Sequence, residues 1–231
     1  MAAQPLPRGR GSEKASVFLV VLFLALLLTP VIASAVIVDR IAIAVGDKIV
    51  TESEIDLRIR LSAFQNHEKA DFSLSSRKVA AQELIDQRLV EREMDVGHYP
   101  RLEETRRKAL LSEYEKADYK SDSAALANAL AVYGLKPQDL EDDLGRQSDL
   151  LTFLNLRFRP AVQVTDEDIR KYFEENAPKT GALNEMRAAI EQKLTNARAD
   201  KELDLWLADQ RKRTRIEYLE KDLQEDQGNK K

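Results

Sequence analysis

The chain has 231 residues, of which 33% are charged, and its formal net charge at pH 7 is −4. A composition with 8 Gly and 7 Pro favours a mostly helical chain with one main domain, and the acidic balance gives no indication of nucleic-acid binding. Because the sequence has no Cys, disulfides, a lipoprotein anchor cysteine and thiolate metal sites are excluded. The two histidines, His67 and His98, have no evident ligand partner nearby, so we expect no zinc site or histidine-based catalytic centre.

Residues 1–35 have the layout of a secretory signal peptide. A basic beginning is followed by the apolar run Val17–Leu28, by Pro30 and by the small residues Ala33–Ala35, which is typical of a cleavage site. The run is shorter than the roughly 20 apolar residues of a bilayer span. We therefore predict export to the periplasm, with an uncleaved signal anchor in the inner membrane as the alternative. In either case the rest of the chain faces the extracytoplasmic side.

The stretch Val38–Val50 predicts a small β-hairpin, because apolar residues alternate on both sides of a Gly-Asp turn. Thr51 and Glu54 follow with the spacing of a capping box, so a helix is expected to begin at Thr51. A two-stranded hairpin is marginally stable in water and needs a third strand. The alternating segment Thr214–Leu219 is the predicted partner.

Helices are predicted along most of the remaining chain from caps, helix stops and apolar spacing. They cover Thr51–Phe64, Arg77–Val96, Leu102–Tyr119, an Ala-rich segment ending near Tyr133, Gln138–Arg159, a segment beginning near Thr165, and Ala182–Arg213. A polar loop is expected at 65–76, a linker at 177–181 and a disordered polar tail at 220–231.

The predicted helix Gln138–Arg159 has an apolar stripe and additional apolar residues beside it. The stripe, expected to pack on one neighbour, consists of Leu140, Leu144, Leu151, Leu154 and Phe158. Leu150, Phe153 and Leu156 lie outside the stripe, so either a second neighbour buries them or they line an exposed groove. In the last long helix the apolar face changes side near Asp200, which turns Leu203, Trp206 and Leu207 toward another part of the molecule.

Three segments resemble SurA-type periplasmic chaperones, in particular their N-terminal domain. The first is Asp39–Ile55, with Asp-Arg-Ile at its beginning and Thr-Glu-Ser-Glu near its end. The second is Leu130–Asn176, with Tyr-Gly-Leu and later Val-Thr-Asp-Glu-Asp-Ile, and the third is Trp206–Ile216, which begins Trp-Leu and continues to an Arg and a short strand. The resemblance covers most of residues 36–219. A parvulin prolyl-isomerase domain usually follows the second segment in that family, but here residues 176–181 stand in its place.

The resemblance implies a mainly α, multi-helix chaperone domain over residues 36–219, with a small antiparallel sheet made by the N-terminal hairpin and a C-terminal strand. It also implies a periplasmic chaperone that binds unfolded polypeptides, outer-membrane protein precursors among them, in an apolar groove. The residues expected to line that groove are Leu126, Leu130, Tyr133, Leu150, Phe153, Leu156, Leu203, Trp206 and Leu207.

The sequence shows no nucleophile–base arrangement, Gly-rich phosphate loop or cluster of metal ligands, so we expect neither an enzyme nor a cofactor. Two alternatives remain open. One is a structural or assembly protein whose apolar faces are filled by a fixed partner or a second copy. The other is an isomerase-family remnant with weak activity, which the missing parvulin domain disfavours.

Overall fold

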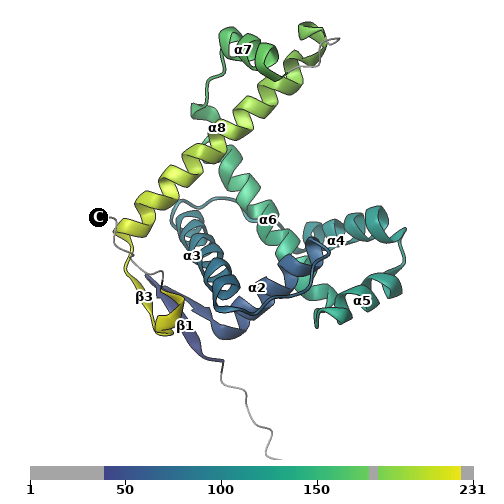
Figure 1. The fold of residues 1–231 in the computed structure, drawn as a ribbon, viewed down its shortest axis with the longest axis vertical. Coiled ribbons are helices and arrows are strands. Elements are labelled where there is room, and N and C mark those ends of the chain that lie inside the picture. Colours follow the sequence, from purple (N-terminus) through teal and green to yellow (C-terminus); the bar gives the residue numbers. More distant parts are fainter. Residues whose placement is uncertain (1–38, 177–181, 225–231) are drawn as a thin grey trace, which may run out of the picture. The chain divides into compact units, whose positions relative to one another are not determined.

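The structure is a computed structural model that describes residues 39–176 and 182–224. These residues form a mainly helical fold with a small three-stranded antiparallel sheet (Figure 1), as predicted from the sequence. No helix within the described ranges is long and apolar enough to cross a membrane. The predicted signal peptide, 1–35, and the predicted linker, 177–181, lie outside the described residues.

The sheet contains β1 (Ile41–Val45), β2 (Lys48–Thr51) and β3 (Ile216–Tyr218). The helices are α2 (Glu52–Gln65), α3 (Leu74–Val96), α4 (Glu104–Tyr119), α5 (Ser123–Val132), α6 (Pro137–Arg157), α7 (Asp166–Asn176) and α8 (Leu183–Arg213). Two short 3-10 helices, η1 (Arg159–Ala161) and η2 (Lys221–Leu223), follow α6 and β3.

The order of the sheet is β2-β1-β3, so the first strand of the domain is paired on both sides. Ile43 of β1 pairs with Val50 of β2 and with Tyr218 of β3, both in antiparallel register. Gly46 makes the turn between β1 and β2 with a φ of 63°, a conformation that glycine adopts without a steric cost. The predicted closure of the hairpin by the C-terminal strand is confirmed.

Side-chain caps determine where the first two helices begin. The backbone N–H of Glu54 donates to Thr51 Oγ1 at 3.3 Å, and the Thr51 N–H donates to Glu54 Oε2 at 3.0 Å, which confirms the predicted capping box. Helix α3 begins at Leu74, three residues earlier than Arg77, where the sequence placed its start. The reason is that Ser73 is the cap, since its hydroxyl accepts from the N–H of Ser76.

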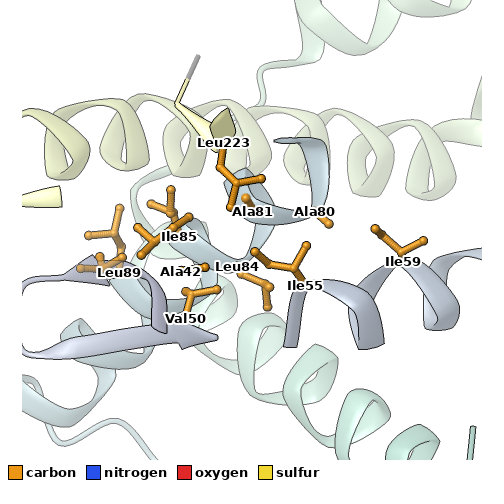
Figure 2. Packing of buried hydrophobic residues seen from close by; sticks show 12 residues of the cluster. Ala42, Val50, Ile55, Ile59, Ala80, Ala81, Leu84, Ile85, Leu89 and Leu223 are labelled. Carbon is orange, nitrogen blue, oxygen red and sulfur yellow. The ribbon is translucent and has the colours of Figure 1, made fainter. Parts of the chain in front are cut away.

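The first core lies between the sheet, α2 and α3 (Figure 2). Its buried members are Ala42, Ile43, Val45, Val50, Ile55, Ile59, Ala80, Ala81, Leu84, Ile85, Leu89 and Leu223. Figure 2 shows Leu223 directed toward α3, next to Ala81. The C-terminal segment is therefore part of the core that encloses β1.

The prediction of a disordered tail from Glu220 onward is wrong for residues 220–224. The N–H groups of Leu219 and Glu220 both donate to the carbonyl oxygen of Ala42, at 2.9 and 3.0 Å. The Glu220 carboxylate accepts two hydrogen bonds from Arg77 of α3, at 3.0 and 2.9 Å, and Leu223 is fully buried. The prediction rested on the mostly polar composition of the tail and overlooked Leu223, which occupies a core position. Residues 225–231 lie outside the described residues.

Two further cores hold the helices together. The second core, between α2, α5 and α6, consists of Leu61, Phe64, Leu126, Leu130, Leu135 and Leu140. The third core, between α3, α6 and α8, consists of Val90, Met94, Phe153, Leu154, Phe158 and Ala199, with Leu203, Trp206 and Leu207 packed against it. Helix α6 thus contributes to both, its N-terminal part to the second and its C-terminal part to the third.

The predicted stripe on α6 is partly wrong. Leu140, Leu154 and Phe158 are buried as expected, but Leu151 is 60% exposed, while Phe153, which the stripe excluded, is fully buried. The face of α6 that packs inward near its C-terminus is therefore centred closer to Phe153. Helix α8, which lies against this part of α6, fixes that face, and periodicity within α6 alone contains no information about its neighbour.

Candidate functional site

Helices α3, α6 and α8 line an open groove, and Arg58 of α2 lies at its edge. Its volume is about 370 Å³, near the lower end of the ~300–1,000 Å³ range of small-ligand pockets. The apolar side chains that line it are all aliphatic or sulfur-containing: Val90, Met94, Leu150, Leu203 and Leu207. We call it the α3–α6–α8 groove.

Helical spacing places these side chains. Val90 and Met94 are four residues apart on α3 and lie on one face, and Leu203 and Leu207 have the same relation on α8. Val90 and Met94 are almost fully buried and form the floor, whereas Leu150 of α6 is 38% exposed and stands at the rim. The third core therefore extends to the surface here instead of being closed over.

Asp143 of α6 lies at the groove, although it is only 3% exposed. Its carboxylate accepts hydrogen bonds from Gln65 Nε2 and Gln147 Nε2, each at 2.8 Å, and from Arg58 Nη1 at 3.4 Å. The Arg146 guanidinium lies 3.5 Å away. A buried carboxylate with this many donors is satisfied, so Asp143 links α2 to α6 and has no free lone pair to offer a cation.

Asp149, six residues after Asp143 on α6, fixes the segment that precedes α4. Its two oxygens accept from the Leu102 N–H at 2.6 Å and from Arg107 Nη2 at 3.0 Å. Gly145 allows Arg107 to lie across α6, because a Cβ at Gly145 would stand 2.8 Å from Arg107 Nη1. The rim of the groove beside Arg101 is held in place by these contacts.

Two carboxylates of α3 at the rim are paired with arginines of other helices. Glu83 accepts from Arg58 Nε at 2.6 Å, and Asp86 accepts two bonds from Arg211 of α8, at 2.7 and 2.6 Å. Burial raises the pKa of Asp86 above the ordinary value, while the hydrogen bonds from Arg211 act in the opposite direction.

A third carboxylate of α3 is held within its own helix. Glu91 accepts from Arg88 at 3.2 Å and from Gln87 Nε2 at 2.8 Å. Each rim carboxylate thus has a partner, and the groove presents little uncompensated charge to a ligand.

This arrangement can bind apolar side chains, and its polar groups are engaged with each other. Within residues 39–176 and 182–224, no group of three or more His, Cys, Asp or Glu side chains could hold a metal ion. The paired rim carboxylates serve to position α2, α3, α6 and α8. The chemistry that the groove supports is burial of apolar surface next to neutralised charge.

Of the residues predicted to line a client groove, the structure brings together Leu150, Leu203 and Leu207. Phe153 belongs to the third core and Trp206 packs against that core, with their ring centroids 5.4 Å apart, and neither residue lines the groove. Phe153 is fully buried, so the expectation that it offers contact area to a client is wrong. Its ring is enclosed because α8 packs on this face of α6.

The other predicted residues lie elsewhere. Leu126 and Leu130 are buried in the second core, and Tyr133 packs against it with its ring edge on Phe64, 5.6 Å between centroids. The Ala-rich helix α5 has few large apolar side chains, and its two leucines dock it on the second core, so they do not line the groove. Leu156 is 52% exposed but does not line the groove.

The α3 residues that form the floor, Val90 and Met94, are not among the residues predicted from the sequence to line a groove. The signal for them was present, because the apolar residues of α3 spread over a wide arc, which indicates a helix contacted on several sides. The glutamines of the groove, Gln87 and Gln147, have no signal in the sequence, because polar residues on exposed helix faces are common.

No protein-family model matches this chain, and a comparison with curated proteins finds no match. The likeness to SurA-type chaperones therefore rests on the motifs in the sequence and stays a resemblance.

Proposed function

We propose that this protein is a chaperone that holds apolar segments of unfolded polypeptides in the α3–α6–α8 groove. One observation carries the proposal: the third core opens to the surface through aliphatic side chains, while the carboxylates around the opening are paired with arginines or glutamines. The exposed apolar surface is thus available to a guest. The charged groups beside it already have partners within the protein and need no charged group from the guest.

Binding of this kind depends on apolar area. Removing apolar surface from water contributes about 25 cal/mol per Å², so one leucine-sized side chain placed in the groove contributes roughly 1.5–3 kcal/mol. Such a site favours weak binding that tolerates many sequences, which suits a protein that must release its guest. Flexible Met and Leu side chains support the same tolerance, because they adjust to guests of different shape.

The proposed place of action is the periplasm, supported by the signal-peptide layout of residues 1–35. Outer-membrane protein precursors are the proposed guests, and this part of the proposal is supported by the resemblance to SurA-type chaperones. Because the rim charges are paired, we expect guest binding to change little between low and physiological salt concentration.

The proposal is tested by fluorescence anisotropy with a labelled, unstructured peptide rich in leucine. Replacing Leu150 and Leu203 together by Ser removes apolar surface from both walls of the groove, so the variant should bind the peptide roughly tenfold more weakly, about 1.4 kcal/mol for the pair. The matched control replaces Leu151 and Leu205 by Ser. These neighbours are 60% and 57% exposed and lie outside the groove, so peptide affinity should stay at the wild-type value.

Equal weakening in both variants would mean that the peptide binds to exposed leucines in general, and the groove would then have no role. A fixed partner or self-association, the alternative from the sequence, is examined by sedimentation of the mature protein with and without a denatured guest. A stable complex in the absence of guest, with no change on adding one, would favour that alternative.

A further inference from the structure

Two glutamines line the α3–α6–α8 groove from different helices, Gln87 on α3 and Gln147 on α6. The Gln87 amide donates from Nε2 to Glu91 Oε1, and the Gln147 amide donates from Nε2 to Asp143 Oδ2, each at 2.8 Å. Both walls of the groove therefore present the same unit, a side-chain amide joined to a carboxylate of its own helix.

The carboxylates fix the orientation of these amides. An ionised carboxylate can accept a hydrogen bond but cannot donate one, so the NH₂ group of each glutamine must face it. The amide oxygen then points away from the carboxylate. Among the described residues, no hydrogen bond ends on the oxygen of Gln87 or of Gln147. Each wall thus keeps one oriented acceptor that a donor on a guest can use.

An extended polypeptide is the guest whose chemistry fits this pair of acceptors. Its backbone carries an N–H donor at every residue except proline, whatever the side chains are, and an N–H left without a partner in an apolar groove is costly. Its apolar side chains can contact the aliphatic lining formed by Leu150, Leu203 and Leu207. An apolar small molecule without donors would use the lining but not the two oxygens.

We infer that Gln87 and Gln147 accept hydrogen bonds from backbone N–H groups of a bound extended polypeptide and thereby make the groove selective for peptide chains. This inference rests on the proposed function and identifies the chemical group that the site recognises. It explains how a groove without free charge distinguishes an unfolded chain from other apolar solutes, because every polypeptide offers the same backbone donors.

The test compares a labelled peptide of alternating leucine and serine with an ester analogue in which the central amides are replaced by esters. The ester lacks the N–H donor and keeps the extended shape. Wild-type protein should bind the ester analogue roughly three- to tenfold more weakly, the effect of losing one or two neutral hydrogen bonds. A variant with Gln87→Met and Gln147→Met should bind both peptides equally, with the affinity that wild type shows for the ester.

Gln138→Met is the matched control. Gln138 also lies on α6 and donates to a carboxylate one turn away, Asp142 at 3.1 Å, but it does not line the groove. The Gln138→Met variant should prefer the amide peptide over the ester analogue by the same factor as wild type. Methionine keeps the length of glutamine, and a melting curve for each variant shows whether its fold is intact.

The inference is overturned if the double variant still prefers the amide peptide by the wild-type factor, or if wild type does not distinguish the two peptides. These outcomes are separate from a failure of the proposed function, in which wild type binds neither peptide or the Leu150→Ser/Leu203→Ser variant binds as well as wild type.

Discussion

Whether a single apolar side chain belongs to the core or to the groove is decided by its neighbours in space. Phe153 contacts Tyr99, Phe158 and Trp206 with ring centroids 5.1, 5.7 and 5.4 Å apart, and it is fully buried. Leu156, three residues later on the same helix, is 52% exposed. The sequence alone does not distinguish the two residues, because both lie outside the predicted apolar stripe of α6.

Replacing Phe153 by Ala should therefore lower the free energy of unfolding by about 3–5 kcal/mol, the usual cost of emptying an aromatic core position. Leu156→Ser should change it by less than about 0.5 kcal/mol, because the side chain is largely in water already. Urea denaturation followed by circular dichroism measures both. Similar values for the two variants would contradict the packing described for the third core.

Asp168 makes the pH dependence of a single helix contact testable. The hydrogen bond from Arg198 of α8, together with those from the N–H and hydroxyl of Thr165, lowers the pKa of this carboxyl from 3.8 to about 2. Since the folded pKa is the lower one, the contribution of this contact to stability is complete above about pH 4 and is lost as the pH falls through about 2.

A ¹³C NMR titration of the Asp168 carboxyl should give a midpoint near 2 in the wild-type protein. In an Arg198→Gln variant the midpoint should move upward toward 3.8, because the strongest of the lowering contacts is gone. An unchanged midpoint would mean that α7 does not dock on α8 through this pair.

At the scale of elements, the C-terminal segment after β3 acts as a structural part of the domain. It contributes Leu223 to the first core and Glu220 to Arg77, which also pairs with Asp56 of α2 at 2.9 Å. One arginine of α3 thus holds both α2 and the segment that follows β3.

Leu223→Ala should lower the free energy of unfolding by about 2–5 kcal/mol, because a fully buried leucine is truncated. Leu219→Ala is the matched control. It is 59% exposed and should have a small effect. Thermal unfolding followed by circular dichroism measures both, and a melting temperature that does not respond to Leu223→Ala would contradict the placement of η2 against α3.

The sequence sufficed for elements whose determinants are local. The Thr51–Glu54 capping box, the Gly-Asp turn and the sequence Tyr-Gly-Leu-Lys-Pro before α6 predicted their boundaries within a few residues, because caps and turns need only nearby atoms. The alternation of apolar and polar residues around Ile216 predicted β3, because this pattern is also a property of the local sequence.

The groove could be predicted only in part. Leu150, Leu203 and Leu207 were found by their position off the main stripes, but their separation from Leu126 and Leu130 depends on how α5 and α8 dock on α6. That docking is set by contacts between segments distant in sequence, which no periodicity within one helix encodes. Gln87 and Gln147 gain their significance only when α3 and α6 are side by side.

For the whole molecule, the proposed export can be tested on the recovered protein itself. We expect the protein recovered from the extracytoplasmic fraction to begin after Ala35, because Ala33–Ala35 has the small residues of a cleavage site. Intact-mass spectrometry measures this directly. A mass that includes residues 1–35 would indicate the signal-anchor alternative instead.

The position of β1 in the middle of the sheet has a consequence for when the domain can fold. Its second neighbour, β3, lies near the other end of the chain, and so does Leu223, which closes the first core over β1. Pairing of segments so far apart is slow and requires that both be present at once. A chain exported N-terminus first, as proposed above, will therefore hold an incomplete first core until β3 and Leu223 have been released.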